Sequence, residues 1–203
     1  MRKWSCLLVA AIIFTNSAWA GLGSSLMQSA PVAGVGDFEF KIHNDIIFKR
    51  GEMGGGFNLL PHLRTGLIDP FVDVDIFFGT GTTDFQAGIL GKYNLLPDVA
   101  GQVGLSFLLG GSYIRDEDLN AGLLSTGLVV SKYFPVAFGG VEPYGAFQVE
   151  WFMNPGDDTV PLTLILGSRW APVETEPWHF YSEFAVDLND SVWGLALGAA
   201  YPF

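Results

Sequence analysis

The sequence predicts an all-β protein, a transmembrane antiparallel up-and-down β-barrel of about ten strands. Three observations support this prediction. From Asp37 onward, segments of about ten residues alternate between apolar and polar side chains. Short stretches of turn-forming residues separate these segments. After residue 20, no apolar stretch reaches the roughly 18 residues that a membrane-spanning helix needs.

The first 20 residues have the layout of a secretory signal peptide. Two basic residues come first, an apolar run covers residues 6–14, and Ala18 and Ala20 place small side chains before a cleavage site. A short membrane anchor is the alternative, but this run is too short to span a bilayer as a helix. We therefore expect residues 1–20 to direct export and to be removed.

The composition argues against several classes of protein. Cys6, the only cysteine, lies in the predicted signal peptide, so the exported chain is not a disulfide scaffold. Removal of Arg2 and Lys3 changes the net charge from −11 to −13. This acidity argues against nucleic acid as a partner and, less strongly, against a position flat on anionic lipid. We expect no cofactor.

Residues 21–36 are small and weakly apolar, and we expect them to form a flexible periplasmic lead-in, with a short plug as the alternative. The barrel then covers residues 37–203. Its first segment, residues 37–48, places Phe40 and Ile42 on one face and Lys41 and His43 on the other. Since successive side chains of a strand point to opposite faces, we expect apolar residues outside and polar residues inside.

The next four segments repeat this alternation. Residues 57–67 alternate leucine with polar residues, although Pro61 removes a ladder donor and we expect a β-bulge there. Residues 71–79 alternate branched or aromatic residues with two aspartates. In residues 85–93, apolar residues occupy one face, and glutamine and lysine occupy the other. In residues 99–114, the polar face carries glutamine and serine.

The last five segments bring the count to ten, an even number as in bacterial single-chain barrels, with eight or twelve strands as alternatives. Residues 119–133 are poorly patterned, so their facing stays open. Residues 141–152 and 176–187 oppose aromatic to acidic residues, residues 160–170 oppose leucines to threonine and arginine, and residues 191–203 oppose large apolar residues to glycine and alanine.

Two kinds of connection alternate along the chain. If both chain termini lie in the periplasm, the connections that contain proline are also periplasmic. The connections rich in glycine and aspartate then lie outside the cell. The acidic tips at 116–118 and 157–158 have no EF-hand spacing, so we favour a solvated surface facing lipopolysaccharide over a calcium site.

Aromatic residues concentrate near the ends of the predicted segments, as in the interfacial girdles of outer-membrane barrels. A soluble sandwich would place more of them in mid-strand. One predicted rim comprises Phe48, Phe78, Tyr113, Trp151 and Trp193, and the other comprises Tyr93, Trp170, Trp178, Tyr201 and Phe203.

The chain ends Ala-Ala-Tyr-Pro-Phe at 199–203, on a final amphipathic segment. With the signal peptide and the alternating segments, this ending resembles small bacterial outer-membrane β-barrel proteins of the OmpA/OmpW-like class. The resemblance is architectural, covers the mature chain and transfers no functional residue; Pro202 departs slightly from the usual ending. It implies a monomer in the bacterial outer membrane, with lipid and lipopolysaccharide around it and the barrel-insertion machinery reading the strand that ends at Phe203.

The predicted outward faces carry almost no charge, so the strand charges point into the lumen, where each must be paired or hydrated. Basic residues near the periplasmic ends of the even-numbered strands alternate with acidic residues on the neighbouring strands. We expect a salt-bridged belt that closes a structural barrel; solvated wall charges in a narrow small-solute channel are the alternative. The belt residues are Glu39, Arg64, Asp73, Lys92, Lys132, Glu142, Arg169 and Glu183.

Two other functions stay open as alternatives. A barrel-embedded hydrolase acting on lipid or peptide would use His43 with Asp45, or the inward His62 and His179. None of these histidines has a serine two residues on, as outer-membrane lipid A deacylases do, so we expect no enzyme, no catalytic residue and no metal site. A soluble periplasmic barrel that binds an apolar ligand would need its apolar face inward.

Overall fold

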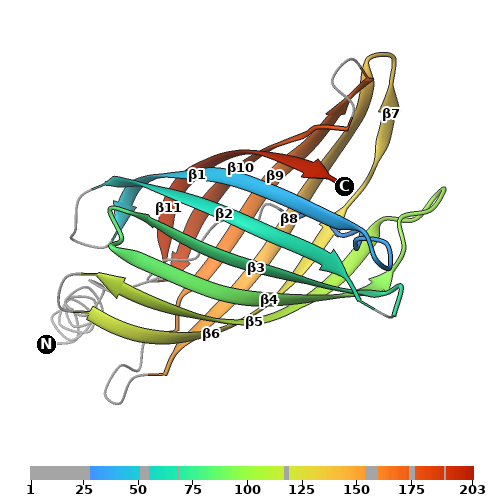
Figure 1. Ribbon diagram of the computed structural model, residues 1–203. Helices are drawn as coiled ribbons and strands as arrows, with labels where there is room; N and C mark the ends of the chain where they lie inside the picture. The colour runs from blue at the N-terminus through green and yellow to red at the C-terminus, as the bar shows by residue number, and fades with distance from the viewer. Residues whose placement is uncertain are drawn as a thin grey trace, which may run out of the picture.

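The computed structural model of the chain describes residues 28–50, 55–67, 69–116, 119–153, 160–173, 177–189 and 191–203 (Figure 1). The predicted signal peptide and residues 21–27 lie outside this part. Among the described residues, no helix is long and apolar enough to cross a membrane.

Eleven strands form one antiparallel sheet in the described part, and ten of them close into a barrel. This confirms the predicted ten-stranded antiparallel up-and-down barrel. Its strands are β1 (Phe38–Arg50), β2 (Gly56–Gly66), β3 (Val72–Gly81), β4 (Phe85–Leu96), β5 (Gly104–Asp116), β6 (Leu119–Ser131), β8 (Gly139–Phe152), β9 (Leu162–Pro172), β10 (His179–Asn189) and β11 (Val192–Pro202). The short β7 (Phe134–Val136) pairs only with the start of β8.

Each barrel strand pairs with its neighbours in chain order, and two pairings complete the ring. Strand β6 passes over β7 to pair with β8, and β1 pairs with β11. The amide of Phe203 donates to the carbonyl oxygen of Phe38 at 2.8 Å, and the amide of Phe38 donates back at 3.2 Å. The end of the chain therefore closes the barrel beside its first strand.

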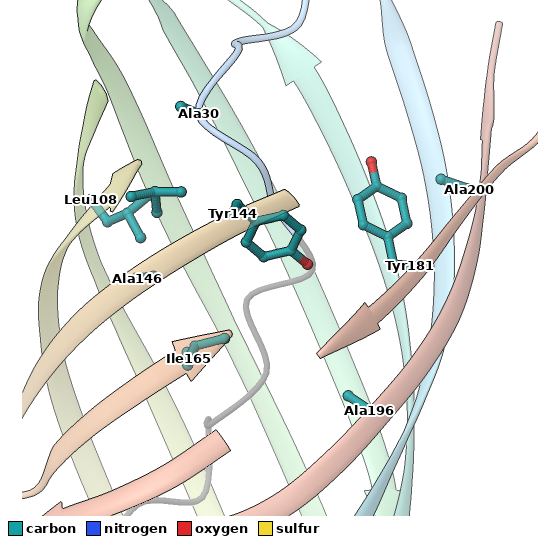
Figure 2. Close-up of a cluster of buried hydrophobic side chains, with 9 residues drawn as sticks. Ala30, Leu108, Tyr144, Ala146, Ile165, Tyr181, Ala196 and Ala200 are labelled. Carbon is teal, nitrogen blue, oxygen red and sulfur yellow. The ribbon is translucent and has the colours of Figure 1, made fainter. Parts of the chain in front are cut away.

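The alternation along the strands places apolar side chains on the outer surface and polar side chains in the interior, the opposite of the usual arrangement in a globular protein. On β1, Phe40 and Ile42 are 45% and 40% exposed, whereas Lys41 and His43 are each 1% exposed. The same division between an apolar outer surface and a largely polar lumen holds around the barrel. A smaller apolar cluster, which includes Leu108 and Ile165, fills part of the lumen (Figure 2).

Pro61 is accommodated without the expected bulge. Opposite β1, it pairs with Ile42 in an unbroken register. Opposite β3, the pairing stops after Leu59, which faces Thr80, and resumes at His62 in the same register. The predicted bulge is wrong, because the missing donor interrupts the ladder without adding a residue to it.

The segment Gln28–Ala33, which we call the plug, lies inside the barrel. Ala30 has no exposed surface and sits on a coil within the ring of strands (Figure 2). The chain then turns at Gly36, whose φ of 82° favours glycine, and continues into β1. Backbone groups of this segment find partners on the barrel wall, an arrangement of the kind that the plug alternative describes.

Candidate functional site

A chain of charged side chains crosses the lumen at the end of the barrel where β1 begins and β11 ends. Arg64 Nε on β2 donates to Asp73 Oδ2 on β3 at 2.8 Å, and Arg64 Nη1 lies 3.5 Å from Glu39 Oε1 on β1. Lys92 Nζ on β4 lies 3.5 Å from the same Asp73 oxygen. Two carboxylates and two cations thus connect four neighbouring strands.

The chain continues around the other side of the lumen. His179 Nδ1 on β10 lies 3.5 Å from Glu39 Oε2, and Arg169 Nη2 on β9 lies 3.2 Å from His179 Nε2. Arg169 Nη1 donates to Glu142 Oε2 on β8 at 3.0 Å, and Ser131 Oγ on β6 donates to Glu142 Oε1 at 2.7 Å. We call this set the charge belt: Lys92, Asp73, Arg64, Glu39, His179, Arg169, Glu142 and Ser131.

The charge belt contains six of the eight residues named from the sequence, and each of its lysines and arginines lies within 3.5 Å of a carboxylate oxygen. His179 and Ser131 were not in the predicted set. His179 carried a signal, because the alternation along its segment already placed it inward. Glu183 lies outside the belt, where it accepts a hydrogen bond from the Tyr144 hydroxyl at 2.6 Å.

Lys132 lies apart from the belt, which corrects the sequence prediction. Strand β6 ends at Ser131, one residue before Lys132. The side chains at even-numbered positions of this strand, such as Leu124 and Leu128, face outward, so the same alternation places Lys132 on the outer side. Its ammonium group instead pairs with the carboxylate of Asp98 in the loop before β5 and donates to the carbonyl oxygen of Gln102 at 2.7 Å.

Asp98 is held in its ionised form by this contact. Partial burial alone would raise the pKa of the Asp98 carboxyl. The hydrogen bond from Lys132 and a second one from the Tyr133 amide, at 2.6 Å, more than offset that effect, so the pKa lies below its usual 3.8. Lys132 and Asp98 therefore tie the β6–β7 connection to the loop before β5.

The plug fills the space that the charge belt surrounds. Lys92 Nζ donates to the carbonyl oxygens of Ser29 at 2.9 Å and Pro31 at 2.6 Å, and Arg64 Nη2 donates to that of Pro31 at 2.6 Å. In return, the amide of Ala33 donates to Asp73 Oδ2 at 2.9 Å. Lys92 and Arg64 thus bind both the wall carboxylate of Asp73 and the plug backbone.

Serine hydroxyl groups hold the plug on the opposite side. The amide of Ala30 donates to Ser131 Oγ at 3.1 Å, and Ser106 Oγ on β5 donates to the carbonyl oxygen of Ala30. The plug is therefore bound from both sides of the lumen. Because its irregular backbone has no ladder of its own, these contacts satisfy groups that burial would otherwise leave unpaired.

A second polar cluster lies deeper in the lumen around Asp75 on β3. Its carboxylate pairs with Lys41 of β1, accepts from Gln28 Nε2 of the plug at 2.7 Å and lies 3.0 Å from His62 Nδ1. The period-two pattern places Lys41 and Asp75 inward, but they lie on strands that are not neighbours. Reasoning from adjacent strands therefore missed this pair.

Two histidines, His62 and His43, lie between Asp75 and Asp45 beside a small cavity. The rings of His62 and His43 lie 4.6 Å apart, and His43 Nε2 is 3.4 Å from Asp45 Oδ1. The cavity beside them measures about 40 Å³. His62 and Asp75 are both buried, an enclosed position unlike the open cleft that the hydrolase alternative requires.

Among the described residues, no group of three His, Cys, Asp or Glu side chains is placed to hold a metal ion. Most of the acidic tip residues at 116–118 and 157–158 lie outside that part of the chain. The sequence matches no protein-family model and no curated protein.

Proposed function

We propose that the protein is an outer-membrane β-barrel of the bacterial envelope, structural in role, whose lumen is closed in the state described. The observation that carries this proposal is the inverted distribution of side chains. Phe40, Ile76 and Leu109, on three different strands, are 45%, 53% and 53% exposed, while the ionisable strand residues Lys41, Asp75 and Lys92 are buried. Exposure of such an apolar outer surface to water is unfavourable, whereas its contact with the hydrocarbon of a membrane is favourable.

The length of the strands supports the same placement. Strands β2 and β10 have 11 residues each. Such a strand extends roughly 35 Å, or roughly 27 Å along the axis at a tilt of about 40°, close to the apolar band of about 25 Å in these barrels. Aromatic residues near the strand ends, such as Tyr113 and Trp170, are exposed, as interfacial girdles require.

The contents of the lumen argue against the soluble ligand-binding alternative. Such a barrel would line its interior with apolar side chains, as lipocalin-type barrels do. Here the charge belt and the Asp75 cluster occupy the interior, and the apolar side chains that are inside pack against one another and the plug. An apolar ligand would have to displace buried ion pairs.

The belt and the plug together favour a structural role over free passage. Belt contacts span eight of the ten barrel strands, and the plug occupies the space between them. Passage of small solutes would require the plug to leave, which costs the hydrogen bonds that Lys92 and Arg64 make to it. We propose lipid and lipopolysaccharide as surroundings and the barrel-insertion machinery, through the strand ending at Phe203, as the assembly partner.

Refolding of residues 21–203 tests the membrane placement. The chain is diluted from urea into lipid vesicles, and folding is followed by its shifted mobility on unheated gels and by resistance to protease. We expect folding only with lipid or detergent, and silence in planar bilayers at moderate voltage. A monodisperse β-rich protein in plain buffer would refute the membrane placement, whereas a steady current would refute only the closed lumen.

A further inference from the structure

The plug is held by side chains of the barrel wall. Among the described residues, no hydrogen bond joins the backbone of Gln28–Ala33 to the backbone of a strand. Its partners are side chains of five consecutive strands, namely Arg64 on β2, Asp73 and Asp75 on β3, Lys92 on β4, Ser106 on β5 and Ser131 on β6. The pairing of these strands with one another does not use the plug. The wall therefore holds this segment as a binding site holds a ligand.

The groups of the wall match the main chain of an extended peptide. The carbonyl oxygen of Ala30 accepts from Ser106 Oγ, and its amide donates to Ser131 Oγ at 3.1 Å. Pro31 has no amide hydrogen, and its carbonyl oxygen accepts from two wall cations at 2.6 Å each. Because these contacts are made to main-chain atoms, they fix the direction of a bound chain and leave most of its side chains unspecified.

Two positions of the plug are restricted by their side chains. Gln28 Nε2 donates to Asp75 Oδ2 at 2.7 Å, so this position requires a hydrogen-bond donor. Ala30 has no exposed surface and packs in the apolar cluster that includes Leu108 (Figure 2). A Cβ atom added at Gly104 would lie only 3.2 Å from the Ala30 Cβ atom, so the wall of β5 also approaches this side chain closely. A larger residue at position 30 would therefore collide with the wall.

The connection from the plug to β1 is exposed. Val35 is 55% exposed, and a Cβ atom added at Gly36 would point into open space. This connection tethers the plug to the barrel, and a short tether gives a bound segment an effective concentration on the order of millimolar. The plug therefore competes strongly with any free peptide of similar chemistry.

We propose that the wall of β2–β6 is a binding site for an extended peptide of small residues, and that the plug is a tethered ligand which a free peptide can replace. Such a peptide carries a donor at the position of Gln28, a small side chain at that of Ala30, and carbonyl oxygens for Lys92 and Arg64. This binding activity goes beyond the structural role proposed above. The site lies inside the barrel and can be tested in detergent micelles, so a negative result leaves the proposed membrane placement standing.

Cleavage of the tether in the folded protein is the first test. A recognition sequence for a site-specific protease is inserted between Val35 and Gly36, in the exposed connection. The chain of residues 21–203 is refolded in detergent, cleaved and passed over a gel-filtration column. We expect the cleaved segment to elute with the barrel, because its contacts to the wall do not depend on the tether.

Replacement by a free peptide is the second test. A fluorescein-labelled synthetic peptide of residues 21–35 is added to the cleaved protein, and its binding is followed by fluorescence anisotropy. We expect saturable binding that unlabelled peptide displaces. Binding to the uncleaved chain should be at least about a hundredfold weaker, because the tethered plug competes. Loss of the cleaved segment from a folded barrel that binds no free peptide would overturn the proposal, as would a cleaved segment that a large excess of labelled peptide never replaces.

Peptide variants test which groups are recognised and require no change in the barrel. A peptide with Ala30→Leu and a peptide of reversed sequence should not bind, whereas Val32→Ala, at a half-buried position, should bind like the parent peptide. In the barrel, Ser106→Ala removes the donor to Ala30 and should weaken binding at least about threefold. Ser168→Ala, on the outward side of β9, is the matched control and should change nothing. Equal binding of the forward and reversed peptides would contradict recognition of the main chain.

Discussion

The Nζ atom of Lys92 lies 2.9 Å from the carbonyl oxygen of Ser29, so a wall cation of β4 binds the backbone of a segment that precedes the first barrel strand. Both residues are buried. The contact makes the plug part of the lumen rather than an appendage. It also identifies the residue whose loss should release the plug most directly.

Replacement of Lys92 by methionine should loosen the plug. The substitution removes the donor to Ser29 and Pro31 while keeping a side chain of similar length. In a chain without Cys6, Ala30→Cys should react slowly with a maleimide, because Ala30 is fully buried. Adding Lys92→Met should raise the labelling rate at least about tenfold, as a loss of about 1.4 kcal/mol implies.

The same variant tests solute passage. Planar-bilayer recordings should show brief openings for Lys92→Met and none for the parent chain. Lys132→Met, which removes a lysine outside the belt, serves as the matched control and should stay silent and unreactive. Equal labelling of Ala30→Cys in the two backgrounds would show that Lys92 does not retain the plug.

Asp75→Asn should be the most destabilising single change among the lumen carboxylates. The variant leaves the ammonium group of Lys41 buried without its ionised partner, a situation that costs about 3–5 kcal/mol. Urea unfolding in detergent, followed by tryptophan fluorescence, measures the effect. Adding Lys41→Met should recover part of the loss, since the ammonium group that lost the Asp75 carboxylate is then gone. Additive losses in the double variant would contradict the pairing.

An arginine on the outer face distinguishes lipid from water as the solvent. Leu109 lies near the middle of β5 and is exposed, so Leu109→Arg should cost about 2–4 kcal/mol in lipid vesicles. Val99→Arg, in the loop before β5, should cost little. If both substitutions stay within about 0.5 kcal/mol of the parent chain, as on a soluble protein's surface, the outer face does not meet hydrocarbon.

The contact between Lys132 and Asp98 should stabilise the barrel only when Asp98 is ionised. Because folding lowers the pKa of Asp98, its contribution is complete above the unfolded value near 3.8 and is lost as the pH falls through the folded value. Asp98→Asn should therefore cost about 1–2 kcal/mol at pH 7 and progressively less below about pH 4. A constant difference across this range would rule out the ionised contact.

Approximate strand number and bounds, and the direction in which side chains face along the well-patterned segments, follow from the sequence by itself. This information is local, because alternation with a period of two assigns each residue to a face without knowledge of its neighbours in space. Phe40 outside and Lys41 inside β1 are examples. The pairing of Arg64 with Asp73 was also predictable, because their strands are consecutive and the residues lie near the same end.

Contacts across the lumen were decided only by the tertiary structure. Lys41 meets Asp75 although β2 separates their strands, and the plug returns into the barrel to meet Lys92, because closure brings together residues that no local pattern relates. Lys132 was expected in the charge belt but does not join it. It lies one residue past the end of β6, and its ammonium group pairs with Asp98 in the loop before β5. The face to which a side chain points is set by its own strand, whereas the residue that it contacts across the lumen depends on how all ten strands close into the barrel.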